Sequence, residues 1–320
     1  MSVAAPPAIT KPTESISFEA DLRTRRQRRI EFVIESLLFI SASLSVLITI
    51  GIVGMLLRES IPFFKEVSLK QFLGDTQWTP NFADKHFGIW PLVCGTFVTT
   101  VVALFVAVPV GLISAIWLSE YAPGQLREII KPILELLAAV PTVVYGYFAL
   151  LIVTPILQTM LRAVGIELPT FNMLSAGVVM GIMIMPYIAS LSEDAMRAVP
   201  LAMREGSYAM GATRMQTATR VIVPSALSGL TAAFILGVAR AIGETMIVAI
   251  AAGGQPTFTL NPSKEAFTIT SYIVAISKGD TPHGTLEYRT IFAAGLVLML
   301  MTLVFNIAGY VIRKRYRQAY

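Results

Sequence analysis

The sequence predicts an all-α polytopic membrane protein with six transmembrane helices. Apolar residues make up 55% of the 320 residues and charged residues only 14%, about half the charged fraction of an ordinary soluble domain. The apolar residues form continuous runs and do not alternate with polar ones, which favours helices over a β-barrel. Each run reaches the roughly 20 residues that a helix needs to cross a bilayer.

Six runs define the expected spans. In chain order they cover residues 32–57, 87–119, 136–161, 168–192, 221 to about 254, and 290–312. Four of them contain no charged residue, and the first contains only Glu35. The fifth run is interrupted only by Arg240 and Glu244, and these two residues therefore call for a specific explanation.

The basic residues predict the orientation. The two termini and the even-numbered loops carry sixteen Lys and Arg, whereas the odd-numbered loops carry eight. The positive-inside rule therefore places both termini in the cytoplasm. Residues 1–30 are expected to form a basic, disordered cytoplasmic tail, and residues 31–320 the transmembrane domain. Because the basic run at 23–29 adjoins the first span, membrane lipid explains it and no nucleic acid is needed.

Several kinds of chemistry are excluded by composition. Cys94 is the single cysteine, and the two histidines fall in separate loops, so we expect no disulfide framework and no metal site. No pair of a nucleophile and a base is recognisable, so the chain is not expected to be an enzyme. No Gly-Lys dipeptide occurs, so a P-loop is absent and this chain is expected to bind no ATP or other cofactor.

The fourth loop has the character of a docking element. Residues 200–224, PLAMREGSYAMGATRMQTATRVIVP, are predicted to form two short cytoplasmic helices broken at Gly211. Pro200 suits the start of a helix and Gly211 suits a left-handed helix end. An exposed, partly apolar cytoplasmic helix needs a partner.

This loop carries a family resemblance. Glu205-Gly206-Ser207, followed by Gly211 and by Val221-Ile222-Val223-Pro224, resembles the EAA loop of permease subunits of binding-protein-dependent ABC importers. Gly206 and Ser207 stand where alanines are usual, and Val221 and Val223 where isoleucine and leucine are usual. The resemblance implies the type I ABC importer permease fold, with a coupling helix in the loop at about 200–224. It also implies that Glu205, Gly206, Ser207, Gly211 and Pro224 couple the chain to a separate ATPase.

Further stretches narrow the resemblance to phosphate importers. They are LSEYAPG at 118–124, ELLAAVPTVVYG at 135–146, IMPYIA at 184–189 and ARAIGETM at 239–246. They are similar to the PstC family, and the homologous PstA family stays open as an alternative. The resemblance implies a bacterial inner-membrane complex with a PstA-like permease, a PstB-like ATPase dimer that uses ATP, and a PstS-like periplasmic phosphate-binding protein.

The charges in the fifth run are explained by a substrate path. A lone arginine at mid-bilayer costs about 2.5–3.5 kcal/mol on insertion scales, and Glu244 would lie one helical turn after Arg240 on the same face. Arg240 is predicted to provide the counter-charge for phosphate, because a guanidinium matches two phosphate oxygens. Glu244 is predicted to neutralise Arg240 when the path is empty. It is also predicted to accept a hydrogen bond from the proton that phosphate carries near neutral pH, and to repel sulfate, which carries no such proton. A purely structural Arg–Glu lock is the competing interpretation.

Other functions remain open at this stage. The loop motif alone also fits a permease for sulfate or molybdate. A secondary transporter or channel would need no ATPase, and a role in reporting phosphate status to a regulator would be compatible with the fold.

Overall fold

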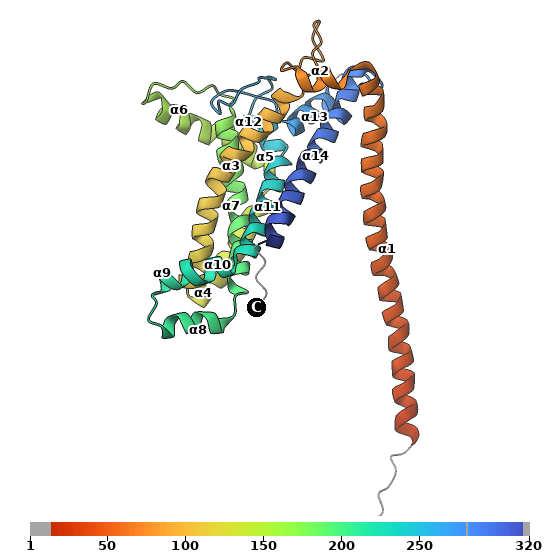
Figure 1. The fold of residues 1–320 in the computed structure, drawn as a ribbon, viewed down its shortest axis with the longest axis vertical. Helices are drawn as coiled ribbons and strands as arrows, with labels where there is room; N and C mark the ends of the chain where they lie inside the picture. The colour runs from red at the N-terminus through yellow and green to blue at the C-terminus, as the bar shows by residue number, and fades with distance from the viewer. Residues whose placement is uncertain (1–13, 280, 316–320) are drawn as a thin grey trace, which may run out of the picture. The chain divides into compact units, whose positions relative to one another are not determined.

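The computed structural model describes residues 14–279 and 281–315, which are almost entirely helical (Figure 1). The α-helices are α1 (Glu14–Glu66), α2 (Leu69–Gly74), α3 (Trp90–Ile116), α4 (Gly124–Ala138), α5 (Thr142–Phe148), α6 (Thr154–Arg162), α7 (Met173–Arg197), α8 (Leu201–Ala209), α9 (Arg214–Thr217), α10 (Val223–Ser225), α11 (Leu227–Ile242), α12 (Met246–Ala251), α13 (Ile269–Lys278) and α14 (Leu286–Arg315). Three π-helical turns continue them: η1 (Trp117–Tyr121), η2 (Ala149–Val153) and η3 (Ala218–Ile222). The predicted all-α architecture is confirmed for the described residues.

The described chain separates at Met55 into two units. The first unit holds most of α1, an apolar helix whose side chains from Ile30 onward are largely exposed within the unit. Helix α1 already begins at Glu14, so the later part of the predicted tail is helical. Residues 1–13 of that tail and 316–320 at the other end lie outside the described residues.

Among the residues that the structure describes, five helical segments are long and apolar enough to cross a membrane: Ile30–Glu66, Trp90–Tyr121, Thr142–Arg162, Met173–Arg197 and Leu286–Arg315. A sixth span is obtained if Arg214–Ser225 and Leu227–Ile242, which meet at an angle of 73°, count as one. The six predicted runs thus correspond to helices, although the bent pair departs from a simple span.

The predicted continuous helix at 221–254 is wrong. The chain bends at Ala226, helix α11 ends at Ile242, and the next helix, α12, begins only at Met246. Pro224 has no amide hydrogen to donate in the helix, and Glu244 lies in the break, where its side chain accepts backbone hydrogen bonds from the following helix. The apolar run is therefore interrupted by the proline and by the hydrogen bonds of Glu244, and it does not form one continuous helix.

Helices α3 and α7 form the centre of the second unit. They approach closely because small residues line the contact. A Cβ atom at Gly177 would lie 2.7 Å from the Cβ of Val102, and one at Gly181 would lie 2.7 Å from the carbonyl oxygen of Ala103. Helices α3 and α7 thus form a closely packed pair. Helix α11 packs against both of them, and α4 packs against α7.

One end of the second unit is closed by aromatic packing. Phe63, Phe72, Trp78, Phe87 and Tyr272 are buried and meet edge to face. The helices α8 and α9 lie at the opposite end of this unit from α2 (Figure 1). The candidate docking loop and the aromatic cluster therefore mark opposite ends of the bundle.

Candidate functional site: the coupling loop and the Arg240 region

The loop after α7 folds as two short helices, as predicted. Pro200, with φ −54° and ψ 138°, precedes α8, and Gly211 breaks the chain with φ +82°, a left-handed conformation that suits glycine. Helix α9 then begins with a capping box between Thr213 and Gln216. The hydroxyls of Ser207 and Thr217 lie 2.9 Å apart, which joins the two helices to each other.

The outer surface of this loop is exposed. Glu205, Gly206, Gly211 and Pro224 are exposed and Ser207 is half-buried. Exposed apolar side chains accompany them: Leu201, Tyr208, Met210 and Met215. Met210 is 88% exposed. The two short helices α8 and α9 thus present a surface of mixed apolar and polar side chains, which is suited to binding in a groove of another protein.

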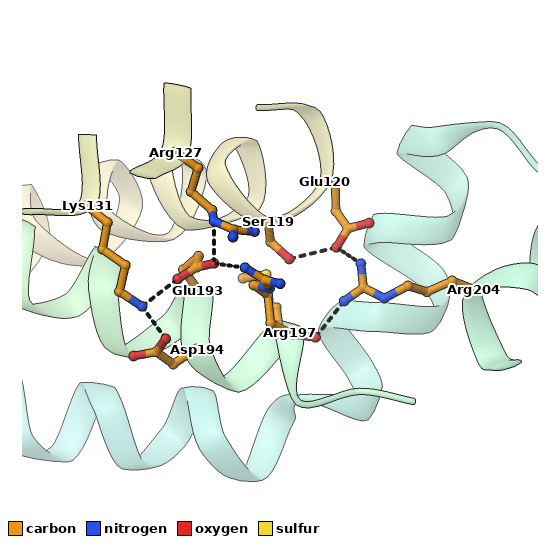
Figure 2. Close-up of polar contacts among 9 residues, drawn as sticks. Ser119, Glu120, Arg127, Lys131, Glu193, Asp194, Arg197 and Arg204 are labelled. Carbon is orange, nitrogen blue, oxygen red and sulfur yellow. Dashed lines mark hydrogen bonds and ion pairs between the residues drawn. The ribbon is translucent and has the colours of Figure 1, made fainter. Parts of the chain in front are cut away.

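The inner face of α8 is held by one arginine. Arg204 Nη1 lies 2.5 Å from Glu120 Oε1 on η1, and Arg204 Nη2 donates to the carbonyl oxygen of Met196 at 2.8 Å (Figure 2). The Ser119 hydroxyl donates to the same Glu120 oxygen at 2.7 Å. The two charged side chains are 14% and 3% exposed, so the pair is shielded from water.

A second group of charges ties α4 to α7 beside it (Figure 2). Glu193, which is 1% exposed, lies 2.9 Å from Lys131 Nζ through its Oε2 atom. Its Oε1 atom lies 4.0 Å from Arg127 and 3.9 Å from Arg197. Asp194 also pairs with Lys131. A buried carboxylate thus has three cations around it, which compensates its loss of hydration.

Sequence reasoning did not find these ion pairs. Glu120 falls inside the stretch that carries the family resemblance, and Glu193 ends an apolar run, but neither position reveals its partner. Both glutamates directly follow a predicted span, near the loop that is expected to dock on an ATPase. That position is the signal from which an ion pair could have been predicted.

Arg240 and Glu244 do not lie as predicted. Arg240 sits in the last turn of α11 and is exposed in the isolated chain, whereas Glu244 lies beyond the helix end and is 8% exposed. Within the described residues, no ion pair joins them. The predicted spacing of one turn on a common helical face is therefore wrong, because Gly243 ends the helix between them.

Each of the two residues has other partners. Arg240 Nη2 donates to the carbonyl oxygen of Ala138 at 3.4 Å, and the guanidinium carbon lies 5.8 Å from the centroid of the Tyr187 ring. Glu244 Oε1 accepts hydrogen bonds from the backbone amides of Met246 at 3.0 Å and Ile247 at 3.2 Å. Glu244, one position before the N-cap residue Thr245, thus satisfies two of the free amides at the start of α12 in the manner of a helix cap.

The spanning bundle with its protruding two-helix loop is the architecture of an importer permease subunit. The chain belongs to the family described as the binding-protein-dependent transport system inner membrane component, whose model matches residues 107–318. It is consequently a multi-pass inner membrane protein, and its class is a transport permease.

Comparison with known proteins agrees. The chain is 36% identical over 271 residues to the probable ABC transporter permease protein YqgH of Bacillus subtilis, covering 84% of each chain. It is 34% identical over 249 residues to the phosphate transport system permease protein PstC of Haemophilus influenzae, covering 72% of this chain and 76% of the relative. A chain of a bacterial alginate ABC transporter solved with its periplasmic protein is similar in fold, with a TM-score of 0.60 at 15% identity over 92% of this chain and 99% of that chain.

Proposed function

We propose that this chain is the PstC-like permease subunit of an ATP-driven phosphate importer. The similarity to PstC of Haemophilus influenzae supports the substrate class, and the observation that carries the mechanism is the guanidinium of Arg240. It is a single cation in the apolar helix α11, and it is exposed in the isolated chain.

Arg240 is suited to a transient contact with phosphate. A guanidinium has five N–H donors, and in the described part of the chain Arg240 uses one of them, in a hydrogen bond to the carbonyl oxygen of Ala138. The remaining donors can bind two phosphate oxygens side by side. Because an arginine facing lipid would cost several kcal/mol, we infer that this surface faces an aqueous path shared with a second permease subunit.

Glu244 has a narrower role than its charge suggested. Its Oε1 atom is engaged by two amides of α12, and it makes no ion pair with Arg240 among the described side chains. Neutralisation of an empty path by this carboxylate would therefore require a different conformation. Repulsion of sulfate remains part of the proposal, since a fixed carboxylate near the path disfavours a fully deprotonated dianion.

The coupling loop supplies the link to ATP. We infer that Glu205, Gly206, Ser207, Gly211 and Pro224 dock on a PstB-like ATPase dimer at the cytoplasmic side, with both termini of this chain on that side. A PstA-like permease completes the path, and a PstS-like periplasmic protein delivers phosphate at the opposite surface. This chain then contributes the path while the ATPase hydrolyses ATP.

The proposal is tested by purifying the chain with its partners and measuring labelled phosphate uptake into vesicles. Wild-type complex should import phosphate only when ATP is supplied on the side of the ATPase. Arg240→Gln should reduce uptake at least about tenfold, which corresponds to about 1.4 kcal/mol, and Arg240→Lys should reduce it less because one charge is kept without the planar fork.

The controls separate the alternatives. Excess sulfate or molybdate should leave phosphate uptake unchanged, and competition by either would indicate a different oxyanion. Uptake that continues without ATP would point to an ATPase-independent transporter. Normal uptake by an assembled Arg240→Gln complex would reduce Arg240 to a structural residue.

A further inference from the structure

Two neighbouring residues of α8 have different surroundings. Glu205 is exposed, whereas Arg204 is mostly buried against the bundle. The first belongs to the face proposed to dock on the ATPase, and the second contacts the spanning helices. Any displacement imposed on the outer face of α8 must therefore act on the contacts of Arg204.

Arg204 contacts two spanning helices at once. Through Glu120 it reaches η1, the π-helical continuation of α3, and through the carbonyl oxygen of Met196 it reaches the last turn of α7. The planar guanidinium presents donors in a fixed fork, so the positions of α8, η1 and the end of α7 depend on each other. A lysine in this place could not satisfy both acceptors with the same geometry.

We call the contacts of Arg204 with Glu120 and with the Met196 carbonyl oxygen the clamp. The helices that the clamp joins are closely packed against each other. Helices α3 and α7 approach so closely at Gly177 and Gly181 that an added Cβ atom at either glycine would lie 2.7 Å from the facing helix. Met196 and Tyr187 lie nine positions apart on α7, about 13 Å along the axis of a helix. Since the Tyr187 ring is the aromatic neighbour of Arg240, one helix carries both the contact with the coupling loop and the contact with the proposed phosphate residue.

We propose that Arg204 is the positioning residue that converts movement of the coupling helix into movement of the α3 and α7 pair. The inference rests on the proposed function, because it assumes that α8 docks on an ATPase. With the clamp intact, displacement of α8 shifts both helices together. Without it, α8 follows the ATPase while the spanning helices stay behind, so ATP is hydrolysed without transport.

The nearby Lys131–Asp194 pair provides a matched control. It lies in the second group of charges, beside the Arg204–Glu120 pair (Figure 2), and it joins α4 to α7 and not to α8. Its side chains are also more exposed, at 27% and 57%. Asp194→Asn breaks this ion pair, leaves Lys131 beside the buried Glu193 and does not affect the contacts of the coupling helix.

The experiment measures the number of phosphate ions imported per ATP hydrolysed, in vesicles containing the whole complex. Arg204→Gln and Glu120→Gln should still copurify with the ATPase and keep at least about half of its hydrolysis rate, while the import ratio falls about fivefold or more, a size typical of coupling changes. Arg204→Lys should lie between these variants and the wild type. Asp194→Asn should keep the wild-type ratio, because it leaves Lys131 paired with the buried Glu193.

Exchange of the two charges is the rescue test. The double variant Arg204→Glu with Glu120→Arg should recover part of the ratio lost in either single charge reversal. If Arg204→Gln fails to assemble, the ratios of Arg204→Lys and Glu120→Gln decide instead. An unchanged ratio in the assembled variants, or an equal fall for Asp194→Asn, would overturn the inference. Absence of ATP-driven phosphate uptake in the wild type would instead refute the proposed function.

Discussion

The guanidinium carbon of Arg240 on α11 lies 5.8 Å from the centroid of the Tyr187 ring on α7, not beside Glu244. The two helices can bring these side chains together because they cross closely at Gly237, where a Cβ atom would lie 3.0 Å from Ile188 Cδ1. A cation above a ring face is attracted by the negative potential of the π system. The ring therefore orients the arginine without cancelling its charge, which leaves the guanidinium able to bind an anion.

Replacement of Tyr187 tests this orientation. Tyr187→Leu should lower phosphate uptake about two- to fivefold, because a cation–π contact at an exposed site contributes about 0.5–1 kcal/mol. Tyr187→Phe keeps the ring and should behave like the wild type. The measurement is initial uptake rate by the assembled complex across phosphate concentrations. An equal loss in both variants would assign the effect to the hydroxyl group.

Two substitutions of Glu244 distinguish its structural role in α12 from its proposed role in selecting phosphate over sulfate. Glu244→Ala removes the acceptor for the Met246 and Ile247 amides and should destabilise the α12 region by about 1 kcal/mol, as the loss of a helix cap does. Glu244→Gln keeps an acceptor oxygen but removes the charge, so it should assemble normally and admit sulfate more readily. Thermal unfolding in detergent reports the first effect, and sulfate competition for uptake reports the second.

If Glu244→Gln remains as selective as the wild type, Glu244 acts only as a cap. That outcome would leave the role proposed for Arg240 intact, because the two side chains form no ion pair in the described structure.

The sequence allowed the spanning helices and the two-helix loop to be predicted because both depend on local signals. Long apolar runs must be helical in a membrane, and Gly211 supplies the left-handed conformation that breaks the loop. The break at Gly243 was missed because an apolar pattern continues on both sides of it. The pattern records burial, whereas the cap formed by Glu244 depends on hydrogen bonds.

The clamp at Arg204 could not be predicted for a different reason. Its partners are Glu120, 84 positions earlier, and the backbone of Met196. Contacts over such separations depend on the tertiary arrangement of helices, and one sequence gives no direct measure of it. The burial of Glu193 between α4 and α7 has the same origin.

Substitutions of a buried and an exposed glycine test the close packing of α3 against α7. Gly177→Val should destabilise the chain by about 1–3 kcal/mol or more, because the added atoms overlap with Val102 and the Thr99 carbonyl in the centre of the bundle. Gly206→Ala is the matched control, since no atom lies within 4 Å of an added Cβ there. It should stabilise α8 by up to about 1 kcal/mol.

Thermal unfolding and the yield of assembled complex measure both glycine variants. Loss of ATPase binding in Gly206→Ala would show that the docking surface needs a bare backbone at this position. Wild-type stability of Gly177→Val would contradict the close contact between α3 and α7.

The loop before α3 should respond to pH through His86. Its hydrogen bonds to Asp75, at 2.7 Å, and to Asp84 raise the pKa of His86 above 6.5. Burial tends to raise the pKa of Asp75, but hydrogen bonds from the Gln77 amide and His86 outweigh it and lower this pKa below 3.8. The contribution of His86 is thus complete below 6.5 and is lost as the pH rises through its elevated pKa, whereas that of Asp75 is lost only in acid.

Hydrogen exchange measures the effect. The amides of Thr79 and Gly88 bond to the carbonyl oxygens of His86 and Gln77, at 2.9 and 2.8 Å. After correction for the intrinsic pH dependence of exchange, peptides containing them should be less protected at about pH 8 than at about pH 6, the range in which histidine changes charge. His86→Asn and Asp75→Asn should each remove most of this difference. If the full difference persists in His86→Asn, another group controls the loop, because the imidazole and its proton are then absent.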